Sequence, residues 1–183
     1  MNILKKALIA VAVLLVILVA IGFVLPSKVE VKRSIVIAAS PAQIQPFVAN
    51  LKEWSLWAPW NQEMDPTVVY TYSEPSVGTG AHMSWTAEKI GSGVLTLTKA
   101  EPAEGIWYDI GFNNDGMITK GSMIYAPSDG GTLVTWTNTS ELGGNPVHRY
   151  FGLMMDAMLG ADFDKGLAKL KLVVENSQVE KAK

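Results

Sequence analysis

The side chains that most often carry enzyme chemistry are sparse in this chain and do not cluster along it. The 183 residues include no cysteine and two histidines, His82 and His148, which do not form a His-x-x-x-His pair. A zinc site would therefore need carboxylates from distant segments. The chain has no Gly-x-Ser-x-Gly elbow and no phosphate loop, and Gly78-Thr79-Gly80 fits a turn between strands. We expect no metal ion, no cofactor and no catalytic residue.

Asp109, a carboxylate within a predicted strand, is a candidate for acid–base chemistry. A carboxylate can transfer protons at neutral pH when an apolar cavity tunes its pKa. Because side chains alternate along a strand, Tyr108 shares one face with bulky apolar residues, whereas Asp109 shares the opposite face with Trp107. If the bulky face forms the core, Asp109 points outward. Tyr108 then either packs in the core or orients a ligand with its hydroxyl.

Large apolar side chains give the stronger indication of function. The chain has six tryptophans, and Phe151, Met154, Met155 and Met158 recur at spacings of three and four. Methionine fills irregular space, and small-molecule sites are usually apolar pockets with few polar groups. Gly166 lies inside a predicted helix, where glycine costs about 1 kcal/mol relative to alanine, and either a close approach of the sheet or of a ligand or a poorly optimised local sequence would explain it. The candidate ligand-binding residues are Trp57, Trp60, Trp85, Tyr108, Phe151, Met154, Met158 and Gly166. The alternative is that these residues only fill the core.

The predicted elements that position these side chains begin with a strand. Val29–Ala38 alternates and is rich in β-branched residues. Ser40 and Gln43 then form a capping box for a short amphipathic helix, with Pro41 in its first turn. Gly- and Pro-containing turns separate six further predicted strands, which are Thr67–Ser73, Gly80–Ala87, Gly93–Ala100, Gly105–Phe112, Thr119–Ala126 and Thr132–Ser140. Their short connections predict an antiparallel meander.

Helix returns at the C-terminus. Asn145 and Pro146 form a helix start, from which we predict one segment over Pro146–Leu159 and a second over Asp162–Glu175, interrupted at Gly160. A sheet with helices gathered at its ends is an α+β fold. We place this domain at residues 27–176 and expect residues 177–183 to form a flexible polar tail.

An apolar run of 19 residues, Ala7–Leu25, precedes the domain. As a helix rising about 1.5 Å per residue it would be roughly 28 Å long, close to the hydrocarbon thickness of a bilayer. A cleaved signal peptide has a shorter apolar region of roughly 7–15 residues. Ala20-Ile21-Gly22 nevertheless fits a cleavage site, so the signal peptide stays an alternative. We favour a single-pass membrane anchor over residues 1–26.

The orientation of this anchor is nearly balanced by charge. Lys5 and Lys6 precede the run, and Lys28, Lys32 and Arg33 follow it, so the positive-inside rule gives almost a tie. A short basic tail before a long apolar stretch is typical of a signal anchor. We therefore expect the N-terminus inside and the domain in the periplasm at the inner membrane. A formal net charge of −2 without a basic stripe argues against nucleic-acid binding.

Four segments carry a family resemblance. They are Ile35–Pro41 (IVIAASP), Trp54–Trp60 (WSLWAPW), Gly78–Ala81 with Trp85, and Asp162–Lys171 (DFDKGLAKLK). Together they resemble the START-like helix-grip (SRPBCC) superfamily, especially membrane-anchored bacterial members of its polyketide cyclase/dehydrase branch. The resemblance implies a curved seven-stranded sheet around a long C-terminal helix, with a cavity between them. It identifies no ligand, because the superfamily includes lipid carriers, receptors, stress regulators and a few cyclases.

Three functions are compatible with these observations. We expect non-catalytic binding of a hydrophobic small molecule or lipid in the cavity, next to the membrane held by Ala7–Leu25. The first alternative is an envelope interaction or sensor domain, whose exposed face with Trp107, and also Trp136, meets an unidentified protein. The second is a cyclase/dehydratase-like enzyme. This enzyme would need a carboxylate, histidine or tyrosine of perturbed pKa in the pocket.

Overall fold

The computed structural model describes residues 3–112 and 118–181. The elements follow in the order α1 (Ile3–Val24), β1 (Lys28–Ile37), α2 (Pro41–Ala49), the 3-10 helix η1 (Leu51–Glu53), α3 (Trp54–Trp57), β2 (Val69–Tyr72), β3 (His82–Thr86), β4 (Ser92–Glu101), β5 (Gly105–Phe112), β6 (Ile118–Ser128), β7 (Gly131–Glu141) and α4 (Pro146–Lys181). The strands form one seven-stranded antiparallel sheet in the order β1-β7-β6-β5-β4-β3-β2. This confirms the predicted α+β helix-grip fold.

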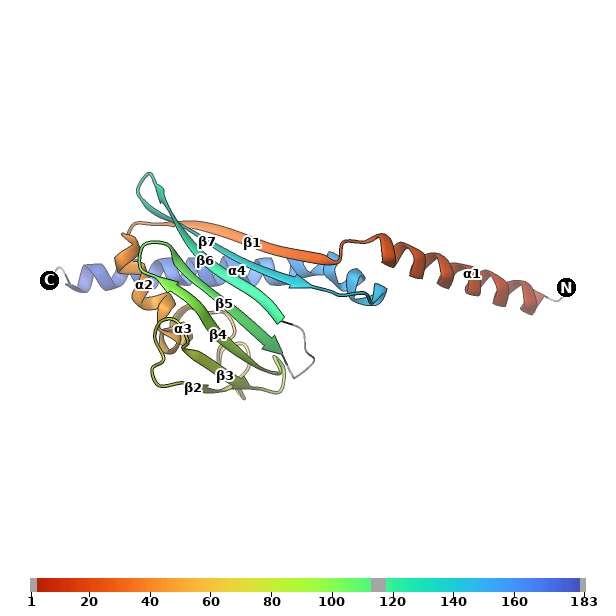
Figure 1. The fold of residues 1–183 in the computed structure, drawn as a ribbon, viewed down its shortest axis with the longest axis horizontal. Coiled ribbons are helices and arrows are strands. Elements are labelled where there is room, and N and C mark those ends of the chain that lie inside the picture. The colour runs from red at the N-terminus through yellow and green to blue at the C-terminus, as the bar shows by residue number, and fades with distance from the viewer. Residues whose placement is uncertain (1–2, 113–117, 182–183) are drawn as a thin grey trace.

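The sheet curves around α4, and the short helices α2 and α3 lie toward the C-terminal half of α4 (Figure 1). The core lies between the inner face of the sheet, α3 and α4. The predicted apolar face of the second C-terminal segment is fully buried there, as Phe163, Leu167, Leu170 and Val174. This face therefore fixes how the second half of α4 sits on the sheet.

Helices α2 and α4 begin where the sequence predicted a helix start. The Ser40 N–H donates to Gln43 Oε1 at 2.8 Å, and Asn145 Oδ1 accepts from the Val147 N–H at 2.9 Å. Both predicted helix starts are therefore confirmed. At the other end, α4 continues through residues 177–181 of the expected tail, and residues 182–183 lie outside the described residues.

The predicted break at Gly160 is wrong, because α4 is one continuous helix. Arg33 from β1 crosses the helix at Gly160 and fills the space that a Cβ would need. Its guanidinium donates to the Asp156 carboxylate at 2.8 and 3.1 Å and to the Asp164 carboxylate at 3.3 Å. Gly160 therefore admits a cross-link between β1 and α4 instead of ending the helix.

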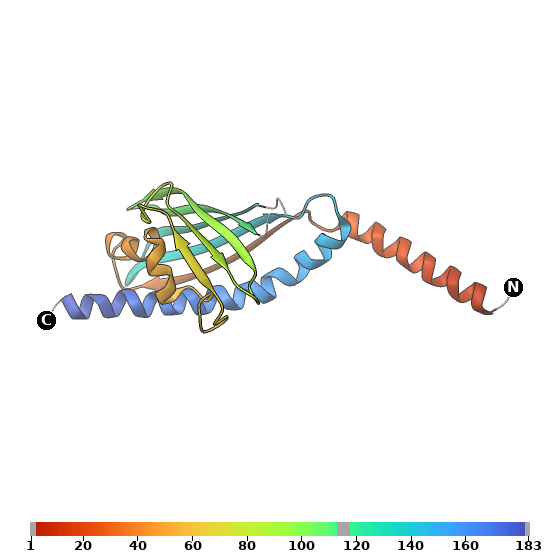
Figure 2. The same ribbon diagram turned by 90° about the horizontal axis from the view of Figure 1, so that it is seen from below.

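Helix α1 projects from the domain and touches it near its C-terminal end (Figure 2). Almost all of its residues are exposed, and its most apolar stretch of 18 residues has a mean hydropathy of 3.3. By length and composition α1 is able to cross a membrane, and an N-terminal signal sequence meets the same criteria. Gly22 is its buried residue and packs against the first turns of α4.

Candidate functional site

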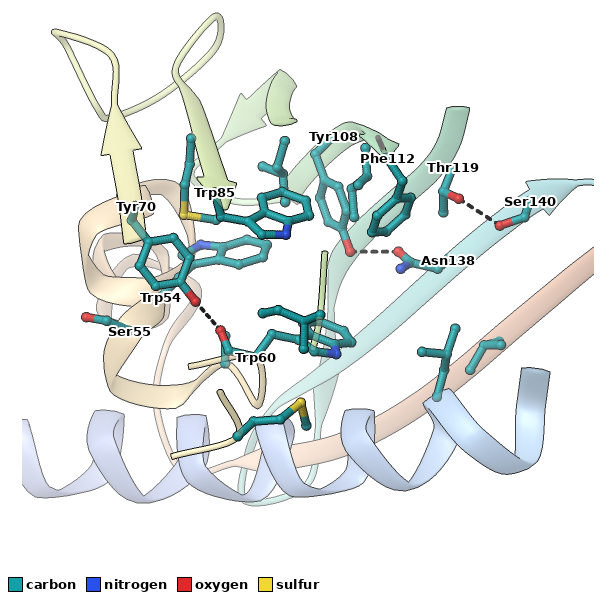
Figure 3. Close-up of a pocket in the computed structure, with 18 of the residues that line it drawn as sticks. Trp54, Ser55, Trp60, Tyr70, Trp85, Tyr108, Phe112, Thr119, Asn138 and Ser140 are labelled. Atoms are coloured by element: carbon teal, nitrogen blue, oxygen red, sulfur yellow. Dashed lines mark hydrogen bonds between the residues drawn. The ribbon is translucent and has the colours of Figure 1, made fainter. Parts of the chain in front are cut away.

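A cavity of about 300 Å³ lies between the inner face of the sheet, α3 and α4 (Figure 3). This volume is at the lower end of the range of about 300–1,000 Å³ that is usual for small-molecule pockets. The lining comes from every strand and from both α3 and α4. It consists of Val29, Val31, Trp54, Ser55, Ala58, Trp60, Met64, Tyr70, Tyr72, Met83, Trp85, Ile90, Leu95, Tyr108, Ile110, Phe112, Thr119, Asn138, Ser140, Met155 and Leu159.

The alternation of β5 decides which of its side chains reach this cavity. Tyr108 and Ile110 point inward and are buried, as the sequence predicted. Asp109 lies on the outer face, with its carboxylate 3.8 Å from Lys120 Nζ. Trp107 lies on the same outer face beneath Lys99, whose Nζ is 4.4 Å from the ring centroid. The carboxylate that we weighed for catalysis therefore points away from the cavity.

Three buried side chains next to the cavity form a chain of hydrogen bonds. The Trp136 indole N–H donates to the Tyr108 hydroxyl at 2.6 Å, and this hydroxyl donates to Asn138 Oδ1 at 2.7 Å. Burial raises the pKa of Tyr108, so its hydroxyl keeps the proton that it donates at neutral pH. An indole nitrogen can only donate, so the Tyr108 hydroxyl accepts from Trp136 and its own proton is available for Asn138 Oδ1.

The same chain orients the Asn138 amide. Because Oδ1 accepts from Tyr108, the amide nitrogen Nδ2 is the remaining donor, and Asn138 is only 8% exposed. Among the described residues, none accepts a hydrogen bond from this nitrogen, which lies at the cavity end of the side chain in Figure 3. The cavity wall therefore presents this amide N–H as a donor that a ligand with an acceptor atom can satisfy.

Some of the other polar groups of the lining are paired with protein atoms, whereas the Trp60 and Trp85 indole N–H groups and the Tyr72 hydroxyl have no hydrogen-bond partner among the described residues. The Thr119 and Ser140 hydroxyls lie 2.8 Å apart and hydrogen-bond to each other. The Tyr70 hydroxyl donates to the Trp60 carbonyl, and burial raises the pKa of Tyr70 to about 12. Among residues 3–112 and 118–181, no carboxylate, imidazole, lysine or arginine side chain belongs to the lining. The lining therefore offers hydroxyl, indole and amide groups for orientation, and no group that titrates near neutral pH.

The structure places three of the eight predicted site residues in the lining, namely Trp60, Trp85 and Tyr108. Trp57 is fully buried behind the cavity, where its ring centroid lies 4.9 Å from that of Trp54 and 5.3 Å from that of Trp136. At Gly166 an added Cβ would lie 2.9 Å from the Trp136 ring and 3.0 Å from Pro59. The close approach expected at Gly166 therefore comes from the sheet.

Phe151, Met154 and Met158 are exposed on α4 and do not line the cavity, contrary to our expectation for this stripe. Met155, which the same spacing singled out, does line the cavity, so the spacing did not show which side of the helix faces inward. The adjacent face, with Met155 and Leu159, forms the cavity wall.

Small residues set this orientation of α4. A Cβ added at Gly152 would lie 2.6 Å from Leu142 and 2.7 Å from Val29, so the glycine face packs against the sheet. The glycines of the first half of α4, Gly152 and Gly160, were therefore the sequence signal for the buried side. They lie on the sheet-facing side, away from the apolar stripe.

Asn138 was missed, although the sequence holds a signal for it. Alternation along β7 puts Val134, Trp136, Asn138 and Ser140 on one buried face. A polar amide between large apolar residues on an inward face is a candidate for ligand contact. Trp136 is also fully buried, so the expectation that it contributes to an exposed interaction face is wrong.

The two histidines contribute no metal site. His82 and His148 are both exposed on the surface. Within residues 3–112 and 118–181, no three His, Cys, Asp or Glu side chains are grouped closely enough to hold a metal ion. The cavity is therefore the candidate functional site.

Solved structures share this fold at low sequence identity. SA2116, a protein of unknown function from Staphylococcus aureus, has a TM-score of 0.63 and 14% identity over 82% of this chain and 96% of its own. The di-domain ARO/CYC StfQ from the steffimycin biosynthetic pathway has a TM-score of 0.59 and 15% identity over 82% of this chain and 52% of its own. Ms6760 from Mycobacterium smegmatis has a TM-score of 0.56 and 16% identity over 79% of this chain and 90% of its own. A search of curated proteins found no match.

The family comparison agrees with the fold. The family model described as polyketide cyclase / dehydrase and lipid transport matches residues 28–175. This range begins at the first residue of β1, includes the whole sheet and cavity, and leaves out α1. The predicted branch of the superfamily is therefore confirmed. The chain belongs to the polyketide cyclase/dehydrase and lipid transport family.

Proposed function

We propose that this protein binds a hydrophobic small molecule or a lipid in the cavity between the sheet and α4, without transforming it. The observation that carries this proposal is the cavity itself, whose walls are mostly apolar and aromatic side chains. Burying apolar ligand surface contributes about 25 cal/mol per Å². A ligand with a substantial apolar part gains most from such walls.

The side chains of the lining support binding over catalysis. A cyclase or dehydratase needs a group that takes or gives a proton near neutral pH. The raised pKa values of Tyr70 and Tyr108 keep both hydroxyls protonated, which suits them to orient a ligand. StfQ is described as an ARO/CYC protein, but the likeness to it is a likeness of fold and names no base in this chain.

We further propose that α1 is an uncleaved membrane span that tethers the domain. Its 22 residues rise about 33 Å as a helix, which matches the hydrocarbon core of a bilayer. The short basic N-terminal tail supports an orientation with the N-terminus inside. The cavity then lies on the periplasmic side of the inner membrane.

Ligand-dependent stability of the full chain in lipid nanodiscs tests the binding proposal. The probe is 2-tridecanone, which has a long apolar chain and one acceptor, and unfolding is followed by circular dichroism. A ligand at about 100 times its Kd stabilises the folded state by about 2.7 kcal/mol. We therefore expect a clear rise in the melting temperature of the wild type.

Two matched variants on α4 locate the effect. Leu159 lines the cavity, so Leu159→Trp fills it and is expected to abolish the rise. Leu172 is exposed on the same helix, so Leu172→Trp is expected to retain the rise. No rise in the wild type, or an equal rise in Leu159→Trp, would show that the cavity is not the binding site.

A further inference from the structure

The first turns of α4 carry an apolar face that is largely exposed. Val147, Phe151, Met154 and Met158 are all exposed, and we call them the outer stripe. Their spacings of four, three and four put them on one side of the helix. The sheet lies against the other side, which holds Gly152, so the outer stripe faces away from it.

The outer stripe begins where α4 meets α1. A Cβ at Gly22 would lie 2.6 Å from Pro146 Cβ and 3.0 Å from the Tyr150 ring, so the two helices touch directly. The Tyr150 hydroxyl donates to the Leu18 carbonyl at 2.6 Å. Arg149 donates to the Phe23 carbonyl at 2.7 Å, where a cation also suits the C-terminal end of the α1 dipole.

These contacts set the depth of α4 relative to the span. Leu18 lies six residues before Val24, which corresponds to about 9 Å along a helix. If α1 spans the hydrocarbon core, the start of α4 lies beside its outermost part. A tyrosine at this depth is typical of the membrane–water interface.

The two helices form an open elbow, and the sheet lies outside it (Figure 2). The outer stripe points away from the sheet and therefore into the elbow, where the bilayer around α1 would lie. Charge does not oppose this placement. Between Val147 and Met158 the acidic residue is Asp156, and Arg33 pairs with it at 2.8 Å.

We propose that the outer stripe lies in the surface of the bilayer, so that the first turns of α4 separate the lipid from the cavity. The inference rests on the proposed membrane span. One face of this helical segment then touches lipid, while Met155 and Leu159 on the adjacent face line the cavity. A hydrophobic ligand would pass along this one helix between the bilayer and its site.

The absence of cysteine from the chain allows a direct test, because a single introduced cysteine is a unique labelling site. The full-length variants Met154→Cys, Leu172→Cys and Val13→Cys are labelled with the fluorophore NBD and placed in phosphatidylcholine nanodiscs. Met154 and Leu172 match in exposure, at 57% and 59% on the same helix. Nitroxide-bearing phosphatidylcholine then quenches any label that contacts lipid.

We expect the label at position 154 to be quenched nearly as strongly as the label at position 13, and the label at position 172 to be quenched much less. Equal weak quenching at positions 154 and 172, with strong quenching at 13, would overturn the inference and leave the span intact. Blue-shifted emission at 154 without quenching would show a protein contact, such as a second copy, and would also overturn it. Weak quenching at position 13 would instead refute the proposed span.

Discussion

At the scale of single residues, Asn138 gives the cavity a preference that its apolar walls lack. The Tyr108 hydroxyl, which accepts from Trp136, donates to Oδ1 of this amide, and Nδ2 remains as a donor toward the cavity. A buried donor without a partner costs free energy, and a ligand acceptor removes that cost. We therefore expect ligands with a carbonyl, carboxylate or phosphate oxygen to bind more tightly than hydrocarbons of equal length.

Paired ligands measure this preference. After correction for partition into protein-free nanodiscs, wild type should bind 2-tridecanone about fivefold more tightly than tridecane, because one neutral hydrogen bond contributes about 1 kcal/mol. Asn138→Leu keeps the size of the side chain but removes its polar atoms, so the preference should fall. Thr119→Val removes a hydroxyl elsewhere in the lining and should keep it. A preserved preference in Asn138→Leu would exclude the donor role.

At the scale of elements, a buried carboxylate holds two loops at the edge of the cavity. Asp65 is fully buried, and its oxygens accept from the Thr67 hydroxyl at 2.6 Å and from the Lys89 and Ile90 N–H groups at 2.7 and 3.2 Å. The loop before β2 is thereby tied to the connection between β3 and β4. Ile90 lines the cavity, so this tie helps to shape the wall.

The tie makes stability depend on pH. The hydrogen bond from Thr67, followed by those from backbone N–H groups, lowers the pKa of Asp65 to about 2. Because the folded pKa lies below the unfolded value of about 3.9, the contribution of Asp65 is present above pH 4 and is lost as the pH falls toward 2. In Asp65→Asn an amide nitrogen replaces one carboxylate oxygen. This nitrogen cannot accept a hydrogen bond, so the bonds to that oxygen are lost. We expect a lower melting temperature than wild type at pH 6, with the difference shrinking between pH 4 and pH 2.

Thermal melts followed by circular dichroism across this range check the prediction. Glu63→Gln is a suitable control, because Glu63 lies in the same loop and makes an exposed ion pair with Lys169. A constant difference between Asp65→Asn and wild type from pH 6 to pH 2 would rule out this role for the carboxylate.

Local sequence patterns predicted the helices and strands well. The wrong predictions concern features that depend on contacts between residues far apart in the sequence. The bounds of β5 were predicted as observed, because glycine and alternation mark them locally. The break expected at Gly160 failed because Arg33, far away in sequence, occupies the space over the glycine. The spacing of the apolar residues on α4 likewise did not show which side of the helix faces the cavity, because that depends on how the helix packs on the sheet. The inward position of Asn138 could be predicted only once the buried face of β7 was known.

At the scale of the whole molecule, the cavity and the proposed span are connected through α4. The contacts of Tyr150 and Arg149 with α1 hold the start of α4 at the end of the span, and the same helix closes the cavity. This arrangement suits a domain that exchanges a hydrophobic ligand with the bilayer beside it. The family and the fold could be predicted from the sequence, whereas this connection required the placement of α1 against α4.

Native mass spectrometry of the full chain extracted from its own membrane in detergent tests the central claim most directly. We predict that the wild type and Leu172→Trp each carry one tightly held hydrophobic molecule, and that Leu159→Trp does not. A wild-type spectrum that contains only the bare chain, or an adduct that persists in Leu159→Trp, would contradict the claim that this cavity is a ligand site.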